Sequence, residues 1–206
     1  MKPILREGNH TDLLINGEEF FPCLFNAINE AQTEVIIETF ILAEDSVGKE
    51  LQQTLIKAAK RGLRVEITVD DYGTWDLSHD FVKGMTSAGV KLHIFDPQPK
   101  LWGVRLNLFR RLHRKIVVID QKLAFIGGIN YSDDHNISFG KLAKQDYVVK
   151  ITGPVVADIH RSATMLLMRT ASKRARRDHM KRTEVDIPAA TGNTIGLPAF
   201  ISNNIK

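Results

Sequence analysis

The sequence predicts an α/β protein in which helices flank a mixed central sheet. Segments whose apolar residues recur at helical spacing alternate with short apolar runs that are typical of buried strands. Residues 113–130 add an apolar hairpin, and a hairpin is antiparallel, so the sheet must contain both strand directions. With 206 residues, of which 43% are hydrophobic and 25% charged, the chain is long enough to bury one core.

The first half of the chain holds three pairs of helix and strand. Phe20, Leu24 and Ile28 recur at helical spacing, and glycines at positions 62 and 89 end the next two helices. The expected helices are residues 20–31, 47–61 and 77–88, and the expected strands are residues 35–42, 63–69 and 90–95.

The second half continues with the hairpin, a strand over residues 146–151 and a closing helix over 155–169. These elements complete one domain, expected over residues 1–170. Residues 171–206 are expected to be a basic linker, in which the charge run over 172–182 is either solvated or clamps lipid headgroups. Residues 199–206 fit the first strand of a second half that then stops, as in a truncated chain.

The hairpin carries side chains suited to phosphate chemistry. A largely neutral imidazole can attack phosphorus or accept a proton, and a lysine adds positive charge beside it. Two glycines let backbone N–H groups approach an anion, and a carboxamide can donate a hydrogen bond to a phosphate oxygen. Each residue alone has ordinary structural explanations, but the joint spacing favours a functional motif. The motif residues are His113, Lys115, Asp120, Gly127, Gly128 and Asn130.

Strand alternation divides the motif between two faces. His113 and Lys115 are two residues apart, so they project together, on the side of Val117 and Ile119. Asp120 projects the other way. We therefore expect Asp120 to support the site rather than to attack the substrate.

The order of these residues resembles the H-x-K-D signature of the phospholipase D superfamily. Further stretches, such as Glu38-Thr39-Phe40, Phe95-Asp96-Pro97 and Lys144-Gln145-Asp146-Tyr147, are similar to the amino-terminal half of bacterial cardiolipin synthases of the B type. The resemblance covers residues 4–170 and implies a phospholipase D-like α/β sandwich. It names His113, Lys115 and Asp120 as the catalytic motif residues.

The resemblance also implies a two-step displacement that needs neither metal nor cofactor. One motif histidine attacks phosphorus, a second motif histidine protonates the departing alkoxide, and an alcohol or water completes the transfer. Two motifs are therefore required, and this chain has one. We expect the second motif to come from a homodimer or from a complementary half.

Two acidic residues are candidates for the same site. By the resemblance, Asp146 hydrogen-bonds the far nitrogen of His113 and fixes its tautomer. The alternative for Asp146 is an acid that caps an edge strand. Glu38 is a polar residue in an apolar run, and it faces either the same cleft or a wet strand edge.

The segment before the motif has the composition of an interfacial segment. Aromatic and aliphatic groups would enter the acyl boundary while arginines meet phosphates. The alternative is a segment packed on its own domain with its arginines in water. The residues expected to contact a membrane are Trp102, Arg105, Phe109, Arg110 and Arg111.

Composition limits the remaining choices. The net charge of +4 suits either anionic lipid or nucleic acid. The amino terminus lacks the apolar stretch of a signal peptide and no membrane-spanning run is present, so we expect a cytoplasmic protein, peripheral at the inner face of the cell membrane. The single cysteine, Cys23, and the absence of metal-ligand spacing predict no metal and no disulfide.

Three functions remain, and they differ in partner more than in chemistry. The favoured one is cardiolipin synthase-like transfer of a phosphatidyl group from an anionic phospholipid to an alcohol. The second is a homodimeric single-motif phosphodiesterase acting on nucleic acid, which fits less well because aromatic and basic residues interleave only in the segment before the motif. The third is an inactive half-protein that binds lipid or a complementary half.

Overall fold

The computed structural model describes residues 6–74, 76–95, 100–101, 104–105 and 111–185. The chain divides into two units, residues 1–173 and residues 174–206. The first unit contains the sheet and the helices that pack on it. Helix α4 (Val155–Val185) begins in the first unit and continues into the second.

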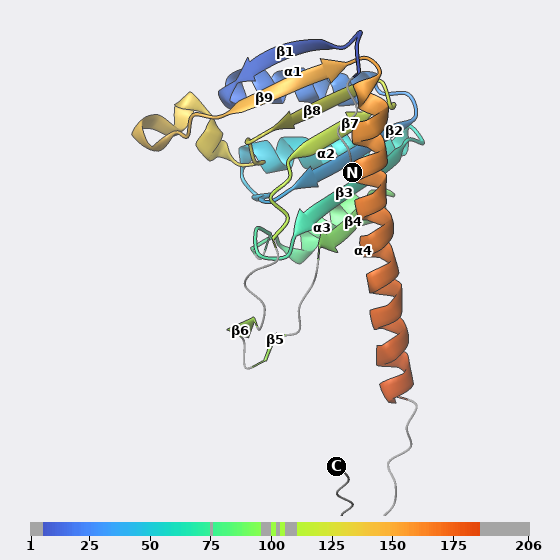
Figure 1. The fold of residues 1–206 in the computed structure, drawn as a ribbon. Coiled ribbons are helices and arrows are strands. Elements are labelled where there is room, and N and C mark those ends of the chain that lie inside the picture. Colours follow the sequence, from blue (N-terminus) through green and yellow to red (C-terminus); the bar gives the residue numbers. More distant parts are fainter. Residues whose placement is uncertain (1–5, 75, 96–99, 102–103, 106–110, 186–206) are drawn as a thin grey trace, which may run out of the picture. The chain divides into compact units, whose positions relative to one another are not determined.

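The described residues form a seven-stranded mixed sheet with the order β1-β9-β8-β7-β2-β3-β4 (Figure 1). The strands β2, β3 and β4 are parallel to one another, and every other neighbouring pair is antiparallel. The predicted mixed sheet is thus confirmed. Its strands are β1 (His10–Ile15), β2 (Glu34–Thr39), β3 (Arg64–Asp70), β4 (Lys91–Phe95), β7 (Ile116–Ile119), β8 (Leu123–Gly127) and β9 (Tyr147–Thr152). A separate short hairpin joins β5 (Lys100–Leu101) and β6 (Val104–Arg105).

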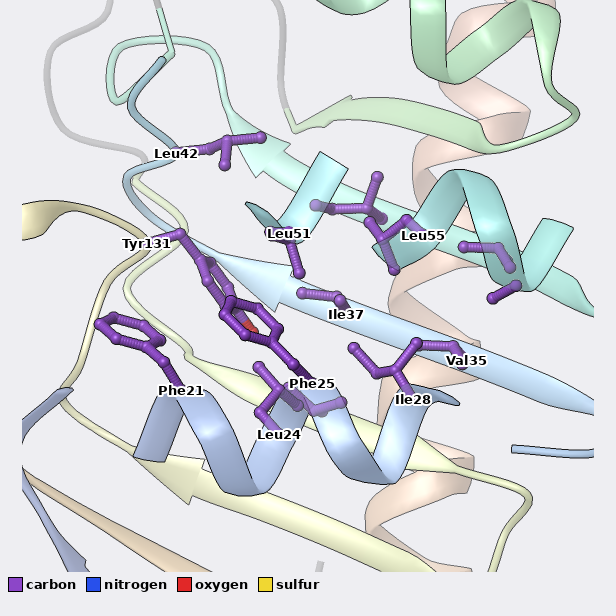
Figure 2. Close-up of a cluster of buried hydrophobic side chains, with 14 of the residues drawn as sticks. Phe21, Leu24, Phe25, Ile28, Val35, Ile37, Leu42, Leu51, Leu55 and Tyr131 are labelled. Carbon is purple, nitrogen blue, oxygen red and sulfur yellow. The ribbon is translucent and has the colours of Figure 1, made fainter. Parts of the chain in front are cut away.

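Three helices cover one face of the sheet and form the main core. They are α1 (Asn16–Glu30), α2 (Ser46–Lys60) and α3 (His79–Ser87). Figure 2 shows the apolar side chains of α1 directed at β2, where Val35 and Ile37 are fully buried. Alternation along β7 sends Val117 and Ile119 into the same core. This face therefore provides most of the hydrophobic burial.

The part of helix α4 that belongs to the first unit covers the opposite face, across the sheet from α1, α2 and α3 (Figure 1). Its residues Val156, Ala163 and Leu167 pack against a small cluster that includes Ile36 and Val118. These two strand residues alternate with those of the main core, as period-two side chains must. The site below lies on a sheet that is therefore covered on both sides.

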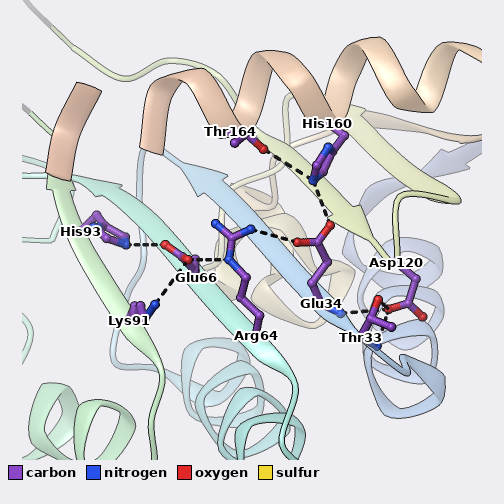
Figure 3. A network of polar contacts seen from close by, with 9 residues as sticks. All are labelled: Thr33, Glu34, Arg64, Glu66, Lys91, His93, Asp120, His160 and Thr164. Atoms are coloured by element: carbon purple, nitrogen blue, oxygen red, sulfur yellow. Dashed lines mark hydrogen bonds and ion pairs between the residues drawn. The ribbon is translucent and has the colours of Figure 1, made fainter. Parts of the chain in front are cut away.

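A layer of charged side chains lies between this face and α4 (Figure 3). Arg64 bridges two buried carboxylates, with 3.2 Å from Nη1 to Glu34 and 2.6 Å from Nε to Glu66. His160 of α4 lies 2.8 Å from Glu34, and His93 lies 2.8 Å from Glu66. Buried carboxylates are tolerated only when they are paired, so this network is a condition of the fold.

The sequence predicted most elements, but several features differ from the expectation. The edge strand β1 was not expected because most of its residues are exposed, so no apolar pattern marks it. Strand β2 ends at Thr39 rather than at residue 42. Helix α4 continues to Val185, so the first part of the expected linker is helical. The expected strand over residues 199–206 lies outside the described residues.

Candidate active site

The site begins where the chain enters β7. The backbone N–H of Leu112 donates to the Asp70 carboxylate at 2.8 Å, and Leu112 itself is buried. Asp70 ends β3, so this bond ties the segment before β7 to the carboxyl end of a parallel strand. The position of the next residue, His113, is set by this anchor.

The His113 imidazole is exposed and lies on the ring of Phe40. The two ring centroids are 4.7 Å apart and the planes differ by 26°. The Lys115 ammonium lies 5.4 Å from the centre of the same Phe40 ring and donates to the His113 carbonyl oxygen at 3.3 Å. These contacts fit the prediction that His113 and Lys115 project from the same side of the strand.

Lys115 is half-buried at the edge of the main core. Apolar side chains, among them Phe20, Phe125 and Tyr131, line the small cavity beside it. This burial lowers the pKa of Lys115, and the charge of Asp146 opposes the shift. A partly desolvated ammonium attracts an anion more strongly than one in water.

The two glycines bring Asp146 close to β8. A Cβ on Gly128 would lie 2.2 Å from an Asp146 carboxylate oxygen, and one on Gly127 would lie 2.2 Å from the Tyr147 carbonyl. Their N–H groups are already used, because Gly127 donates to Lys115 and Gly128 donates to Tyr147. The prediction that these N–H groups bind phosphate is therefore wrong, and the missing side chains make room for Asp146 instead.

Asp146 lies in the site, with a different set of contacts from those predicted. Among the residues that the structure describes, no hydrogen bond joins the Asp146 carboxylate to the His113 ring. The carboxylate instead accepts the N–H of Tyr147 at 2.8 Å and acts electrostatically on Lys115 and His135. In this structure the charge of Asp146 thus favours the charged form of Lys115, and the pairing of Asp146 with His113 stays a prediction.

Hydrogen bonds fix the orientation of the Asn130 carboxamide. The Ile41 N–H donates to the Asn130 side-chain oxygen at 3.1 Å, and the Asn130 N–H donates to Nε2 of His135 at 3.3 Å. With its oxygen held by the backbone, Asn130 offers the nitrogen of the amide as a donor. The donation of a hydrogen bond from this nitrogen to a phosphate oxygen stays a prediction.

Two residues of the site were not predicted. Phe40, directly after β2, supports the His113 ring, and His135 is buried beside Asn130 with 2% of its surface exposed. Phe40 has a weak signal in the sequence, since an aromatic residue follows a buried strand there. His135 lies in a 3₁₀ turn, η1 (Asp133–His135), that has no periodic pattern.

Asp120 lies away from His113, at the other end of β7. Seven residues of extended chain span roughly 23 Å. The Asp120 carboxylate accepts the N–H groups of Gln32, Thr33 and Glu34 at 2.7–3.0 Å. Burial alone would raise the pKa of Asp120, but these donors lower it to about 2. The inclusion of Asp120 among the catalytic residues thus needs correction, and the supporting role expected from alternation fits its contacts.

Glu38 also lies outside the cleft. It is 1% exposed on a central strand, and the Arg114 guanidinium donates to both of its oxygens at 2.7 Å. Arg114 also donates to Ser162 of α4 at 3.1 Å. Burial raises the pKa of Glu38, and Arg114 opposes that shift. Both predicted placements of Glu38, in the cleft and at a wet edge, are wrong because its side chain faces α4.

The predicted membrane segment is mostly outside the described residues. This applies to Trp102, Phe109 and Arg110, and to the side chain of Arg105. Arg111 is described, and its guanidinium lies 4.0 Å from the centre of the Tyr72 ring and 3.8 Å from the Asp70 carboxylate. Arg111 therefore packs on its own domain, which is the alternative for this segment.

Neither a metal centre nor a membrane span is found within the described parts of the chain. No three or more His, Cys, Asp or Glu side chains there are grouped to hold a metal ion. None of the helices there is long and apolar enough to cross a bilayer.

Comparisons with known proteins identify relatives in sequence and in fold. Residues 24–163 match the family described as cardiolipin synthase, PLD-like domain. Cardiolipin synthase B of Salmonella typhi is 57% identical over 159 residues, which are 77% of this chain and 38% of that protein. Cardiolipin synthase B of Escherichia coli K12 is 55% identical over the same length. The chain thus spans well under half the length of these curated relatives.

Solved structures share the fold at low sequence identity. NucT from Helicobacter pylori superposes with a TM-score of 0.60 at 16% identity, over 78% of this chain and 97% of that chain. A phosphatidylserine synthase from Haemophilus influenzae gives a TM-score of 0.55 at 17% identity, over 72% of this chain and 34% of that chain. Together with the family match, these findings show that the chain belongs to the cardiolipin synthase family of phospholipase D-like domains.

Proposed function

We propose that this chain carries one half of the active site of a cardiolipin synthase-like phosphatidyltransferase. The observation that supports this most strongly is the exposed His113 ring, held on Phe40 beside the Lys115 ammonium. The relatives named cardiolipin synthase B supply the substrate class, an anionic phospholipid and an alcohol. The proposal covers the transferase activity, the phospholipid substrate and the assembly of this chain with a second motif.

In the first step, a ring nitrogen of His113 attacks the phosphorus of the phospholipid. A bond forms between nitrogen and phosphorus, and the bond from phosphorus to the departing alcohol oxygen breaks. Lys115 and the carboxamide nitrogen of Asn130 stabilise the charge that develops on the non-bridging oxygens. The departing alkoxide takes a proton from an imidazole across the cleft.

In the second step, the same distant imidazole removes the proton of an incoming hydroxyl group. The new alkoxide attacks phosphorus, and the bond from phosphorus to His113 breaks. The phosphatidyl group is thereby transferred and His113 is free again. Asp146 balances the charge of Lys115 between the two steps.

The distant imidazole must come from outside this chain's motif. Uncatalysed phosphodiester cleavage is slow enough that a catalyst must lower the barrier by on the order of 20 kcal/mol, which one exposed imidazole does not supply. The second motif therefore comes from a complementary half or from a second copy of the chain. A membrane surface would present the lipid to this assembly.

A second candidate is a phosphodiesterase made of two copies of this chain. The observation in its favour is that the fold of this chain covers 97% of NucT, so one such unit makes up nearly a whole chain there. In that case the polyanion replaces the lipid, and binding weakens steeply with salt.

The test measures turnover and assembly state together. Labelled phosphatidylglycerol vesicles are incubated with the chain alone, with increasing chain concentration, and with the complementary segment of a curated relative, and sedimentation is recorded in parallel. We expect phosphatidyl transfer only in assembled forms, and its loss in His113→Ala. His10→Gln, which changes a remote exposed histidine, is the matched control. Full turnover by a strict monomer would refute the proposal, and cleavage of single-stranded DNA without lipid turnover would favour the second candidate.

A further inference from the structure

His135 is a buried histidine for which the proposed reaction has no use. It is 2% exposed and lies five residues after Asn130, at the end of η1. A buried imidazole next to a phosphate-handling side chain needs a reason, because burial of a titratable ring is unfavourable unless its nitrogens have partners.

The turn that carries His135 is held rigidly on helix α2. The Asp133 carboxylate accepts from the Ser46 hydroxyl at 2.6 Å and from the Val47 N–H at 3.1 Å. In return, the Asp133 N–H donates to the Asp45 carboxylate at 2.7 Å. These reciprocal bonds fix η1 to the first turn of α2, so the position of the His135 ring is set by the core.

The hydrogen bond at one ring nitrogen defines the tautomer of His135. Nε2 is 3.3 Å from the Asn130 nitrogen and accepts its N–H, so the ring proton is on Nδ1. Nδ1 is buried and has no hydrogen-bond partner in the part of the chain that the structure describes. The ring therefore acts on Asn130 as an acceptor and is neutral while it does so.

Hydrogen bonds hold both the backbone and the side chain of Asn130. His135 holds its backbone nitrogen, and the Ile41 N–H holds its side-chain oxygen at 3.1 Å. The following residue, Tyr131, donates its N–H to the Ile41 carbonyl at 3.1 Å. Three bonds thus fix the direction of the Asn130 amide nitrogen, and the bond from His135 is the one that a side chain controls.

The charge state of His135 also affects the electrostatic interaction between Asp146 and Lys115. Burial lowers the pKa of His135. The charges of Asp134, whose carboxylate lies 3.7 Å from Nε2, and of Asp146 raise it, and the charges of Lys144 and Lys115 lower it. A protonated ring would lose its acceptor at Nε2 and would compete with Lys115 for Asp146. A neutral ring leaves the Asp146 carboxylate to Lys115.

We propose that His135 is a positioning residue that orients the Asn130 carboxamide toward the phosphoryl group, through the bond from the Asn130 N–H to Nε2. The inference rests on the proposed function for the identity of the phosphoryl ligand. Its structural part, the control of Asn130 by His135, stands on geometry alone.

The test compares two variants that differ in the acceptor they place near Asn130. His135→Gln offers an amide oxygen at the position of Nε2, whereas His135→Phe keeps the ring shape without an acceptor. His93→Gln is the matched control, because it changes another partly buried histidine, bonded to Glu66 in the layer under α4. The readouts are the Asn130 backbone and side-chain amide resonances by NMR, and kcat and KM of the assembled enzyme.

We expect His135→Phe to move the Asn130 resonances and to lower kcat about tenfold or more with little change in KM. We expect His135→Gln to restore both, and His93→Gln to move neither. Unchanged Asn130 resonances in His135→Phe, or equal losses of kcat in the Phe and Gln variants, would overturn the inference. If His135→Phe does not fold, His135→Leu, which has no hydrogen-bond acceptor, replaces it.

The two proposals fail separately in this design. A wild-type assembly without turnover would contradict the proposed function, while the NMR comparison would still support or overturn the role of His135.

Discussion

The His113 imidazole lies on the face of the Phe40 ring, with 4.7 Å between the ring centroids. The Lys115 ammonium faces the same ring at 5.4 Å. Phe40 follows β2 and His113 precedes β7, so the stack joins the ends of two neighbouring antiparallel strands. The exposed ring thereby gains a fixed orientation, which is worth a large factor in rate if His113 is the nucleophile, as proposed above.

Shortening Phe40 should reduce catalysis without unfolding the domain. We expect Phe40→Leu to lower kcat about tenfold to a hundredfold, because the His113 ring loses the surface that orients it. Phe40→Tyr preserves the aromatic face and should retain most of the activity. Steady-state kinetics of the assembled enzyme measure both variants, and equal activity of Phe40→Leu and wild type would show that the stack has no catalytic role.

Substitutions of Asp120 and of His113 should have different effects, the first mainly on stability and the second mainly on turnover. Because donors lower the pKa of Asp120 to about 2, its carboxylate stabilises the folded state above about pH 4, and this contribution disappears as the pH falls toward 2. We expect Asp120→Asn to lower the free energy of unfolding at pH 7 by about 1–2 kcal/mol, allowing for solvent screening. Chemical denaturation at several pH values measures this difference.

His113→Ala is the counterpart. We expect it to abolish turnover and to change stability little, because the His113 ring is exposed. The difference between wild type and Asp120→Asn should shrink steadily on acidification. A difference that is constant from pH 7 to pH 2.5, or a normally stable but inactive Asp120→Asn protein, would contradict the supporting role.

A side chain at position 128 should displace Asp146. In Gly128→Ala the new Cβ would meet the Asp146 carboxylate at 2.2 Å, so the carboxylate must leave its present position. We expect at least a tenfold loss of kcat, measured beside thermal stability. Gly84→Ala is the control, because its Cβ would approach only the side-chain nitrogen of Gln52, at 3.3 Å, and α3 lies outside the site, so kcat should not change. An active Gly128→Ala enzyme would show that the position of Asp146 is unimportant.

The buried pair of Arg114 and Glu38 should show strong coupling. Arg114→Met leaves the 1% exposed Glu38 carboxylate without its partner and should cost about 3 kcal/mol. The double variant Arg114→Met with Glu38→Met should recover most of that loss, because no charge is then left buried. A double-mutant cycle of denaturation midpoints measures the coupling, and strictly additive losses would exclude a direct pair.

Most of the fold is predictable because its elements have strong local patterns. The apolar faces of residues 20–31 and the glycines after two helices mark the helices, and Gly62 and Gly89 indeed adopt positive φ angles of 91° and 99°. Strand β1 is not predictable in this way. Its residues Leu13 and Ile15 are exposed, so the strand is held by pairing with β9 rather than by a buried pattern.

Only the site residues that belong to one continuous strand segment are predictable from their spacing in the sequence. Alternation separates His113 and Lys115 from Asp120 because all three belong to one continuous segment. Phe40 and His135 come to the site through the pairing of β2 with β7 and through bonds between η1 and α2. Those contacts join residues more than 70 positions apart, and a single sequence does not reveal them.

Trapping of the covalent intermediate tests the central claim most directly. Phospholipid labelled in its phosphate is mixed with the assembled enzyme, the reaction is quenched within one turnover, and labelled peptides are mapped by mass spectrometry under alkaline conditions. We predict an acid-labile adduct on His113 that is absent in His113→Ala. Turnover with no adduct on His113 in any assembly state would contradict the account.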